Sequence, residues 1–402
     1  MSNRLKLFRE RMAAFEGAAN PFEAIESGYY VHAPGKLLVD EISDRIALRP
    51  SSSHLLLGGI GSGKTTQLLV ACKQLNEIED THAYYLDVSQ DIDISKISNG
   101  ILTVYAGLEL AKLIKDDENK TVQKSIEIIN KFAFGYTEEH NIHLSSKNLL
   151  NVLSSGIGIT KHEGIIPSQL NQYGIKSDLV KAVSILAKEA LKKYGYIVLI
   201  FDGLDRLHDS KTFMQLVFSD VKAISSMGIG LVLVGPLIAL YDEYRDTMDE
   251  KLDKVYYQPF FDIENDLDAY NFFRDIIQIR SSKDFIEEST ITTLIQFSGG
   301  VLRDFITLTQ ASIEETYLSG EDTVQQSHVL KAVDSFSRSQ LLGVSDTELN
   351  ILTEIINTEI FIPRTDEDLR LLVRRLILEY RKPKIRYAVH PAIKQILEQI
   401  PV

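Results

Sequence analysis

The sequence has little cysteine and no long hydrophobic run. Its 402 residues include one cysteine, Cys72, which excludes an intramolecular disulfide. The longest apolar candidate, residues 229–240, is interrupted by Gly235 and Pro236 and falls short of the roughly 18–20 apolar residues that span a bilayer. Residues 1–17 are charged and lack the apolar core of a signal peptide. We therefore expect a cytoplasmic protein without a membrane segment.

The chain also lacks an excess of positive charge. It carries 43 Lys and Arg against 56 Asp and Glu, a formal net charge of −13. This balance argues against a nucleic-acid footprint over the whole molecule, while a local basic patch remains compatible with it. A content of 44% hydrophobic and 25% charged residues is typical of a globular protein. The length favours two or three domains.

Short apolar runs alternate with helical patterns through the first part of the chain. The runs predict buried strands at residues 54–59, 83–89, 196–202, 229–235 and 255–260. Such alternation predicts an α/β fold with a parallel sheet that helices cover on both faces. We assign residues 1–261 to this domain, with an N-terminal helical segment and a long helical insert at about 97–190.

The pattern becomes mostly helical after Phe261. Four predicted helices form a small helical domain over residues 262–340. Residues 341–402 read as helix, helix, β-wing and helix, which predicts a winged-helix-like module. In that module we expect a helix over 366–380 and a short strand over 385–389.

The segment 58-GGIGSGKTT-66 has the spacing of a phosphate-binding loop, G-x-x-x-x-G-K-T, between a predicted strand and a predicted helix. Glycines permit tight turns that aim backbone N–H groups at phosphate oxygens, and the helix N-terminus favours an anion. Lys64 would bridge the β- and γ-phosphates, and the Thr65 hydroxyl would bind Mg²⁺. The alternatives are a glycine-rich turn with a surface lysine and a nucleotide held only as structure. The predicted ATP-binding residues are Gly58, Gly59, Ile60, Gly61, Ser62, Gly63, Lys64, Thr65 and Thr66.

A second predicted strand, 196-YIVLIFDGLDRL-207, delivers carboxylates to the same kind of site. Asp202 ends the strand, where ligands bind in open α/β sheets, and we predict that it holds Mg²⁺; the alternative is a helix cap or turn. Gly203 follows, where many ATPases carry a glutamate, and glycine cannot act as a base. Asp205 is therefore the water-orienting candidate. It could instead bind magnesium through water or cap the helix near Ser210.

These two motifs together resemble the P-loop ATPases of the AAA+/STAND assemblage, which includes NACHT-type and KAP-type proteins. The acid strand of that assemblage often reads D-G-L-D or D-D-L-D. The order of a further strand, a helical lid and a winged helix is also similar. The resemblance covers about residues 25–340 in arrangement, and its sharp motifs cover a small part of that range. It implies an ATP-dependent and Mg²⁺-dependent hydrolase.

The segment 298-SGGVLRDFI-306 resembles the second sensor of these ATPases. Arg303 would lie in the first turn of a helix, where a cation is unfavourable unless an anion compensates it. The resemblance implies contact with the γ-phosphate; the alternative is pairing with Asp304 or with an acid elsewhere. Two features depart from the pattern. The strand 231–236 ends in Gly-Pro where a polar sensor would stand, and the only arginine-finger candidate, Arg245, has acidic neighbours.

Residues 370–386, RLLVRRLILEYRKPKIR, carry seven basic residues against one acid, Glu379. This segment predicts a contact with the phosphate backbone of DNA or RNA. The alternatives are a solvated helix face and a dock for an acidic surface of another domain. Resemblance to STAND winged helices also implies a phosphate contact by His390, with an ordinary cap before Pro391 as the alternative.

The leading expectation is ATP binding and slow hydrolysis that drives a conformational or assembly switch, in the setting of bacterial defence. The switch would be a homo-oligomer that acts through a separate effector or partner protein. Adenine is favoured over guanine because no N-K-x-D motif follows the acid strand. One alternative is a DNA-associated initiator or loader that uses the basic C-terminal module. Another is a structural protein with a fixed nucleotide.

Overall fold

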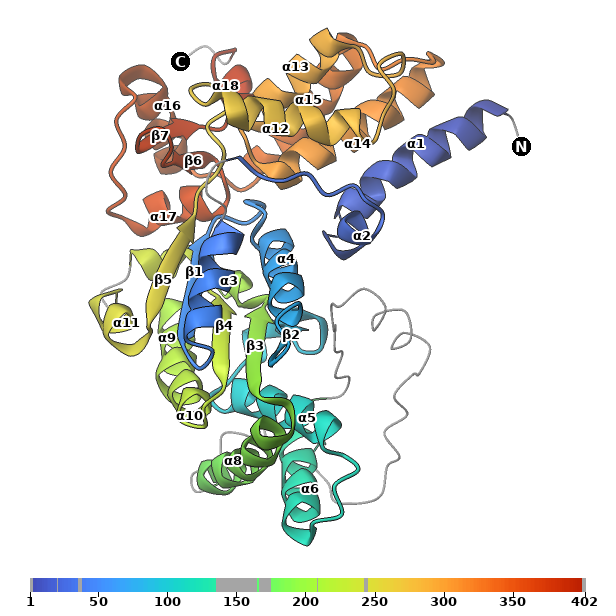
Figure 1. The fold of residues 1–402 in the computed structure, drawn as a ribbon. Helices are drawn as coiled ribbons and strands as arrows, with labels where there is room; N and C mark the ends of the chain where they lie inside the picture. The colour runs from blue at the N-terminus through green and yellow to red at the C-terminus, as the bar shows by residue number, and fades with distance from the viewer. Residues whose placement is uncertain are drawn as a thin grey trace. The chain divides into compact units, whose positions relative to one another are not determined.

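The computed structural model describes residues 3–19, 21–34, 38–134, 165, 175–207, 209–241 and 245–399. The chain forms two compact units, and each is described by itself (Figure 1). The helical unit comprises Met1–Leu37, Gly59–Thr66 and Gln258–Val402, and the α/β unit comprises Leu38–Gly58 and Gln67–Tyr257. Residues 135–164 and 166–174 of the predicted helical insert lie outside the described residues.

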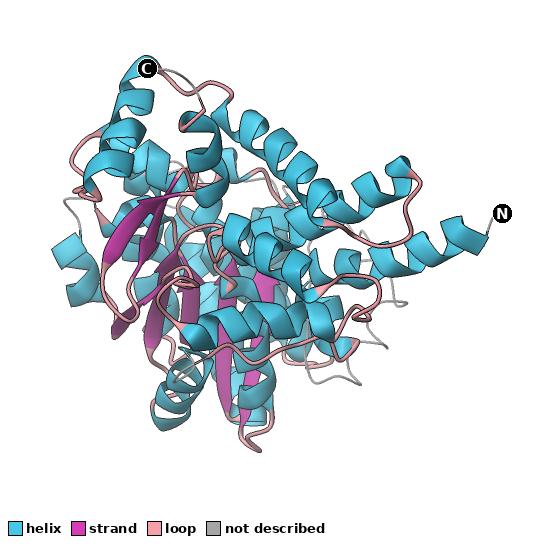
Figure 2. Cartoon of the chain, turned by 90° about the horizontal axis from the view of Figure 1, so that it is seen from above, coloured by secondary structure: helices cyan, strands magenta, loops and turns pink. Residues whose placement is uncertain are grey.

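A five-stranded sheet forms the centre of the α/β unit, with its strands side by side in Figure 2. The strand order is β2-β3-β4-β1-β5, and the pairs β2–β3, β3–β4 and β1–β4 are parallel. This confirms the predicted parallel α/β sheet. The strands are β1 (Ser53–Gly58), β2 (Thr81–Asp87), β3 (Tyr196–Asp202), β4 (Gly230–Val234) and β5 (Lys254–Gln258).

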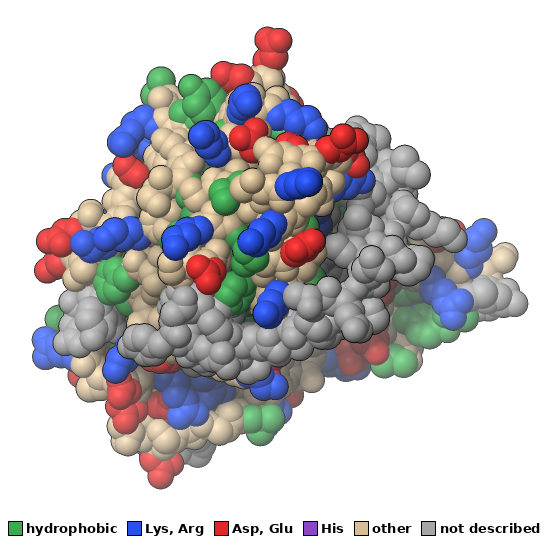
Figure 3. Space-filling model, turned by 90° about the horizontal axis from the view of Figure 1, so that it is seen from below, with side chains coloured by type: hydrophobic (Ala, Val, Ile, Leu, Met, Phe, Trp, Pro, Cys, Tyr) green, Lys and Arg blue, Asp and Glu red, His purple; other side chains and the backbone are tan. Residues whose placement is uncertain are grey.

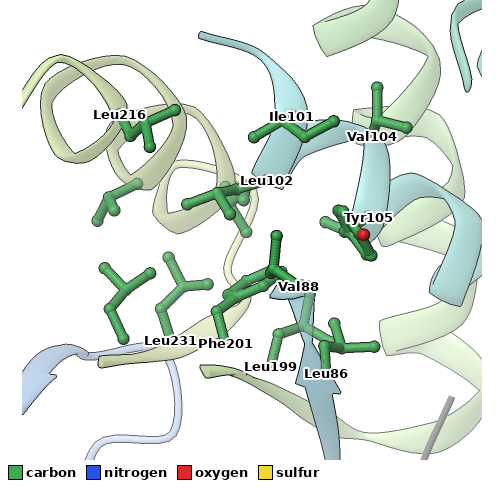
Figure 4. Packing of buried hydrophobic residues seen from close by; sticks show 14 of the residues in the cluster. Leu86, Val88, Ile101, Leu102, Val104, Tyr105, Leu199, Phe201, Leu216 and Leu231 are labelled. Carbon is green, nitrogen blue, oxygen red and sulfur yellow. The ribbon is translucent and has the colours of Figure 1, made fainter. Parts of the chain in front are cut away.

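The inner strands are apolar along their length because both of their faces are buried. Every residue of β1 and β4 is buried, as is every residue of β3 after Tyr196. On one face, Phe201 and Leu231 of the sheet lie close to Leu102 of α5 (Ile101–Leu113) and Leu216 of α9 (Ser210–Leu216) (Figure 4). Full burial of each such side chain contributes about 1.5–3 kcal/mol.

The remaining helices of the α/β unit surround the sheet or extend from it. In the predicted helical insert, α5, α6 and α8 pack on one another. The helices not yet named are α3 (Leu38–Leu48), α4 (Lys64–Asn76), α6 (Lys120–Phe134), α8 (Ile175–Tyr194), α10 (Lys222–Ser225) and α11 (Arg245–Lys251). The short turns are η1 (Val88–Gln90), η2 (Ile94–Lys96), η4 (Leu204–Arg206), the π-helical η5 (Val217–Val221) and η6 (Leu237–Leu240).

The helical unit joins the N-terminal segment to the helices that follow the sheet. Phe8 packs against Phe285 and Tyr317, and the Arg4 guanidinium donates to Asp322 at 3.0 Å. Met1–Leu37 therefore groups with this unit, although the residues that follow it, from Leu38 on, belong to the α/β unit. The helices are α1 (Asn3–Ala19), α2 (Pro21–Glu26), and the four lid helices α12 (Leu267–Gln278), α13 (Glu288–Ser298), α14 (Leu302–Ser319) and α15 (Gln326–Leu341).

The C-terminal module runs in the order helix, helix, hairpin and helix. Its elements are α16 (Asp346–Thr358), α17 (Asp366–Val373), β6 (Ile377–Tyr380), β7 (Arg386–Val389) and α18 (Pro391–Leu397). The strands β6 and β7 pair antiparallel.

The helix predicted over 366–380 is wrong beyond Val373. Arg375 adopts φ +62°, which ends the helical path, and its guanidinium is held by Asp304. The apolar residues after it then pair with β7 as a buried strand, Ile377–Tyr380. A buried strand and a buried helix segment share the same apolar composition, so periodicity alone did not separate them.

The described surface gives no sign of a membrane segment. No described helix is both long and apolar enough to cross a bilayer. On the face shown in Figure 3, the coloured basic and acidic side chains are mixed, with no continuous area of one sign.

The N-terminus of α5 is capped from a distant part of the chain. Asp220, 3% exposed, accepts hydrogen bonds from the backbone N–H of Gly100 at 2.8 Å and of Leu102 at 3.1 Å. It also accepts one from the Thr103 hydroxyl at 3.2 Å. One buried carboxylate thus satisfies three donors at a helix start.

We expect Asp220→Ala to lower the free energy of unfolding by about 2–4 kcal/mol, because buried donors lose their acceptor. Urea denaturation followed by circular dichroism measures the loss, and hydrogen exchange should speed up at the Gly100 and Leu102 amides. Asp209→Ala is the matched control, because Asp209 is an exposed cap of α9. It should cost about 1 kcal/mol. Equal losses would contradict the capping role.

Candidate nucleotide-binding site

The phosphate loop has the strand–loop–helix context that its motif predicts. β1 ends at Gly58 and α4 begins at Lys64. Between them, Gly61 and Gly63 have φ of +89° and +90°, a region that glycine enters without steric cost.

The start of α4 fits a bound polyphosphate. Lys64 is 4% exposed, and its ammonium donates to the Gly59 carbonyl at 2.9 Å. The buried Ser62 hydroxyl oxygen has no hydrogen-bond partner among the described residues. No acidic residue stands in the first turn of α4, which holds Thr65 and Thr66. A buried cation at the positive end of a helix is unfavourable by itself and is stabilised by an anion.

The first turn of α14 packs on this loop within the helical unit. The Arg303 backbone N–H donates to the Gly61 carbonyl at 3.4 Å. A Cβ at Gly61 would lie 2.8 Å from Arg303 Cβ and 3.2 Å from Val301 Cγ1, so a larger residue would push the two segments apart. The structure thus brings the predicted lid residue Arg303, with its exposed side chain, beside the predicted phosphate loop.

The double-glycine turn before α14 is in turn held by the C-terminal module. Tyr380 donates its hydroxyl hydrogen to the Gly299 carbonyl at 2.7 Å. A Cβ at Gly300 would overlap the Phe261 carbonyl, and one at Gly59 would overlap the Phe260 ring. Phe260, Val301, Leu378 and Tyr380 form one buried cluster. The loop, the lid turn and the C-terminal hairpin are therefore packed together.

Asp304 is bound by the C-terminal module. The Arg375 guanidinium donates to both of its carboxylate oxygens, at 2.9 and 3.0 Å, and His390 Nε2 lies 3.5 Å from Oδ2. Burial would raise the pKa of Asp304, but the His390 ring and the Arg375 charge together hold that pKa below its usual value. The structure thus gives Asp304 partners other than Arg303. His390 also caps α18 by accepting the Ala392 N–H.

The predicted basic segment is largely neutralised inside the helical unit. Its five arginines contact nearby acids or carbonyl groups, whereas Lys382 and Lys384 are exposed in the turn between β6 and β7. The predicted alternative of a dock for an acidic surface of another domain fits Arg375 and Arg386, whereas Arg370 and Arg381 pair with acids of the C-terminal module itself. The pairs are Arg370 with Glu348 and the Gly343 carbonyl, Arg374 with the Leu342 carbonyl, Arg375 with Asp304, Arg381 with Glu379, and Arg386 with Asp262 and Glu264.

In the α/β unit, the second half of the predicted site lies at the carboxyl edge of the sheet. Asp202 ends β3, is 4% exposed, and accepts the Tyr85 hydroxyl hydrogen at 2.7 Å. β1 ends at Gly58 on the same edge, with β4 between the two strands. The predicted phosphate loop follows Gly58 in the chain. The start of that loop and the end of the strand that carries Asp202 therefore lie at the same edge of the sheet.

Two residues of this edge, Tyr85 and Asp87, were missed by the sequence reasoning. Burial, and after it the charge of Asp202, hold the pKa of the Tyr85 phenol well above its usual value. The phenol therefore stays protonated and can donate to an ionised Asp202. Asp87 stands directly opposite Asp202 in the β2–β3 register. The available signal was that Tyr85 and Asp87 are two residues apart at the end of a predicted strand, and so share a face.

Gly203 is a glycine for a reason that the motif does not reveal. Its φ is +87°, and a Cβ there would lie 2.7 Å from Asp87 Oδ1 and 2.8 Å from Ser89 Cβ. The space of a side chain at 203 is thus occupied by the neighbouring segment.

The other predicted positions are placed as follows. Asp205 lies half-buried in η4, and the alternative that it caps the helix near Ser210 is wrong, because Asp209 caps α9. The sensor position after β4 faces Phe213, whose ring would lie 2.5 Å from a Cβ at Gly235. Arg245 begins α11.

The carboxylates do not form a metal cluster of their own. Among the described residues, no group of three or more His, Cys, Asp or Glu could hold a metal ion. Mg²⁺ bound with nucleotide usually takes one or two protein ligands and keeps several waters. Of the predicted Mg²⁺ ligands, Thr65 belongs to the helical unit and Asp202 to the α/β unit.

No protein-family model and no curated protein matches the sequence. Among solved structures, the chain is similar to Drosophila ORC bound to DNA (12% identity, TM-score 0.41, covering 100% of this chain and 93% of that one). It is also similar to the Aeropyrum pernix ORC1 protein in complex with DNA (13%, 0.44, 90% and 91%) and to Cdc6p from Pyrobaculum aerophilum (13%, 0.43, 93% and 98%). At these identities and TM-scores the likeness supports no inference about this chain.

We expect Gly203→Ala to destabilise the α/β unit more than Gly228→Ala, by about 1–3 kcal/mol. Both glycines have similar positive φ, +87° and +84°, but the nearest atom to a Cβ at Gly228 is Leu191 Cδ1 at 3.5 Å. The comparison therefore separates crowding by Asp87 and Ser89 from backbone strain, which costs about 1–2 kcal/mol in both. Urea unfolding of the two variants gives the difference between their free energies of unfolding. A difference near zero would show that the segment of Asp87 and Ser89 moves aside at little cost.

Proposed function

We propose that the chain is an AAA+/STAND-like switch protein that binds ATP with Mg²⁺ and hydrolyses it slowly. One observation carries this proposal. β1 and β3 end at the same edge of a parallel sheet with β4 between them, β1 leads into the phosphate loop, and β3 ends in the buried Asp202. A phosphate loop and a carboxylate on a nearby parallel strand are the two parts that nucleotide hydrolysis needs.

Each residue has a defined task in this proposal. The backbone N–H groups of residues 59–66 and the Lys64 ammonium bind the phosphates. Thr65 and Asp202 would hold Mg²⁺, whose charge neutralises the phosphate oxygens during transfer. Tyr85 keeps Asp202 oriented. Arg303, beside the phosphate loop, would contact the γ-phosphate from the lid.

The contacts of the helical unit support a switch. Arg303 belongs to α14, and the turn before α14 is bonded to Tyr380, while Asp304 is bonded to Arg375. A shift of α14 on loss of the γ-phosphate would therefore act directly on the C-terminal module. We propose that this movement controls homo-oligomer assembly or binding of a separate effector protein, in bacterial defence.

A second candidate function is that of a DNA-associated initiator or loader. The observation that favours it is the exposure of Lys382 and Lys384 in the hairpin turn. The arginines around them are engaged within the chain, so these two lysines would make the phosphate contacts. A structural role with a fixed, non-hydrolysed nucleotide is the third candidate.

Turnover of ATP, with and without DNA and at several protein concentrations, separates these candidates. If DNA binds through the turn, Lys382→Ala with Lys384→Ala should reduce the slope of log affinity against log salt by about 2, because two phosphate contacts are lost. An unchanged slope would remove this turn from any DNA contact. Absence of turnover would leave only the structural role.

We expect Lys64→Ala to weaken binding of a fluorescent ATP analogue with Mg²⁺ by about 10–100-fold, because a hydrogen bond from a charged group contributes about 1.5–3 kcal/mol. Lys73→Ala is the control, since Lys73 lies exposed on the same helix. Asp202→Asn should bind the analogue as tightly as the unmodified protein when Mg²⁺ is absent. Addition of Mg²⁺ should raise the affinity of the unmodified protein and leave that of Asp202→Asn unchanged. If Lys64→Ala binds the ATP analogue as tightly as the unmodified protein, the assignment of the phosphate loop is wrong.

A further inference from the structure

The position of a side chain at residue 203 is already filled by a carboxylate from another strand. Asp87 Oδ1 lies 2.7 Å from the place of a Cβ at Gly203. We propose that Asp87 is the catalytic carboxylate of the hydrolysis reaction, and that Gly203 is a glycine in order to admit it. This inference rests on the proposed function, because it concerns the same reaction.

The sheet register places Asp87 on the correct side. In the parallel pair β2–β3, Asp87 stands opposite Asp202, and Tyr85 stands opposite Ile200. Tyr85 reaches Asp202 with its hydroxyl group, so the two share a face of the sheet. Asp87 is two residues beyond Tyr85 on the same strand and therefore projects to that face as well. The carboxylates of Asp87 and Asp202 thus end neighbouring strands side by side.

The Asp87 carboxylate is held in place and still has room for water. Its Oδ1 accepts hydrogen bonds from the Ser89 backbone N–H at 3.1 Å and the Ser89 hydroxyl at 2.6 Å, and its Oδ2 accepts from Gln90 Nε2 at 2.8 Å. A carboxylate offers about four acceptor positions, so these three donors leave capacity for a water molecule. The side chain is half-buried, so solvent reaches it. A fixed, accessible acceptor is what water orientation requires.

Asp205 is the competing group. It lies in the η4 turn beyond Gly203 and is also half-buried. Asp87 ends the strand paired with β3 and stands directly opposite Asp202, and its Oδ1 lies where a side chain at residue 203 would begin. With Asp202 assigned to Mg²⁺, Asp87 is the better placed of the remaining two.

The proposed step is the hydrolysis of ATP to ADP and phosphate. The oxygen of a water molecule forms a bond to the γ-phosphorus, and the bond from that phosphorus to the β–γ bridging oxygen breaks. ADP leaves with the electron pair of the broken bond. Asp87 accepts a proton from the attacking water and releases it to the phosphate product or to solvent.

The test compares turnover at saturating ATP and Mg²⁺ in Asp87→Asn, Asp205→Asn and Ser89→Ala. We expect Asp87→Asn to lower kcat by about 100-fold or more, in the range of general-base removal, with ATP affinity within about threefold of the unmodified protein. Asp205→Asn should lower kcat by less than about tenfold. Ser89→Ala removes one of the donors that hold Asp87 and keeps the carboxylate, so it should lower kcat by less than Asp87→Asn does.

The outcomes separate the inference from the proposed function. If the unmodified protein binds ATP and does not hydrolyse it, the proposed hydrolase function and the assignment of Asp87 are both wrong. If it hydrolyses ATP and Asp87→Asn keeps more than about a third of kcat, or Asp205→Asn loses more than Asp87→Asn, only the assignment of Asp87 falls. Asp87→Ala with added formate decides the case in which Asp87→Asn fails to fold. Recovery of turnover by formate supports Asp87, and a folded variant without recovery overturns it.

Discussion

Parallel pairing of β3 with β2 on one side and β4 on the other is the constraint on which the candidate site depends. It aligns the carboxyl ends of three strands, so that the acid of one strand meets the side chains of the next. The hydrogen bond from Tyr85 to Asp202 follows from this register, and so does the crowding at Gly203. Because both faces of β3 are buried, a slip of one residue would exchange the side chains of its two packed faces and turn Asp202 away from Tyr85.

In the helical unit, polar contacts join three segments: the loop around Gly61, the start of α14 and the C-terminal module. The Gly299 carbonyl binds Tyr380, Asp304 binds Arg375, and Gly61 contacts Arg303. A buried ion pair adds little net stability but is costly to break, since the remaining partner keeps its charge in a poorly solvated site. Such contacts suit a device with two arrangements, because the phosphate loop and the C-terminal hairpin act on the same short turn of the lid.

Local sequence patterns were sufficient for the motifs and most elements. The strand of residues 196–202 was predicted with its observed bounds, because a continuous apolar run ended by an acid and a glycine has one reasonable interpretation. The phosphate loop was equally clear, since its glycine spacing reflects backbone geometry within a few residues. The first-turn position of Arg303 followed from the double glycine before it. Each of these features depends on interactions between residues close in the chain.

The sequence by itself therefore determined the strand order along the chain, the glycine-rich loop between β1 and α4, and the acid at the end of β3. Only the tertiary structure decided what surrounds them. It turned the predicted helix after Val373 into a strand, gave the arginines of 370–386 acidic or carbonyl partners within the chain, and placed Asp87 in the space beside Gly203. These outcomes depend on contacts between segments far apart in sequence. A single sequence carries no local signal for such contacts, because burial and pairing are properties of the folded chain.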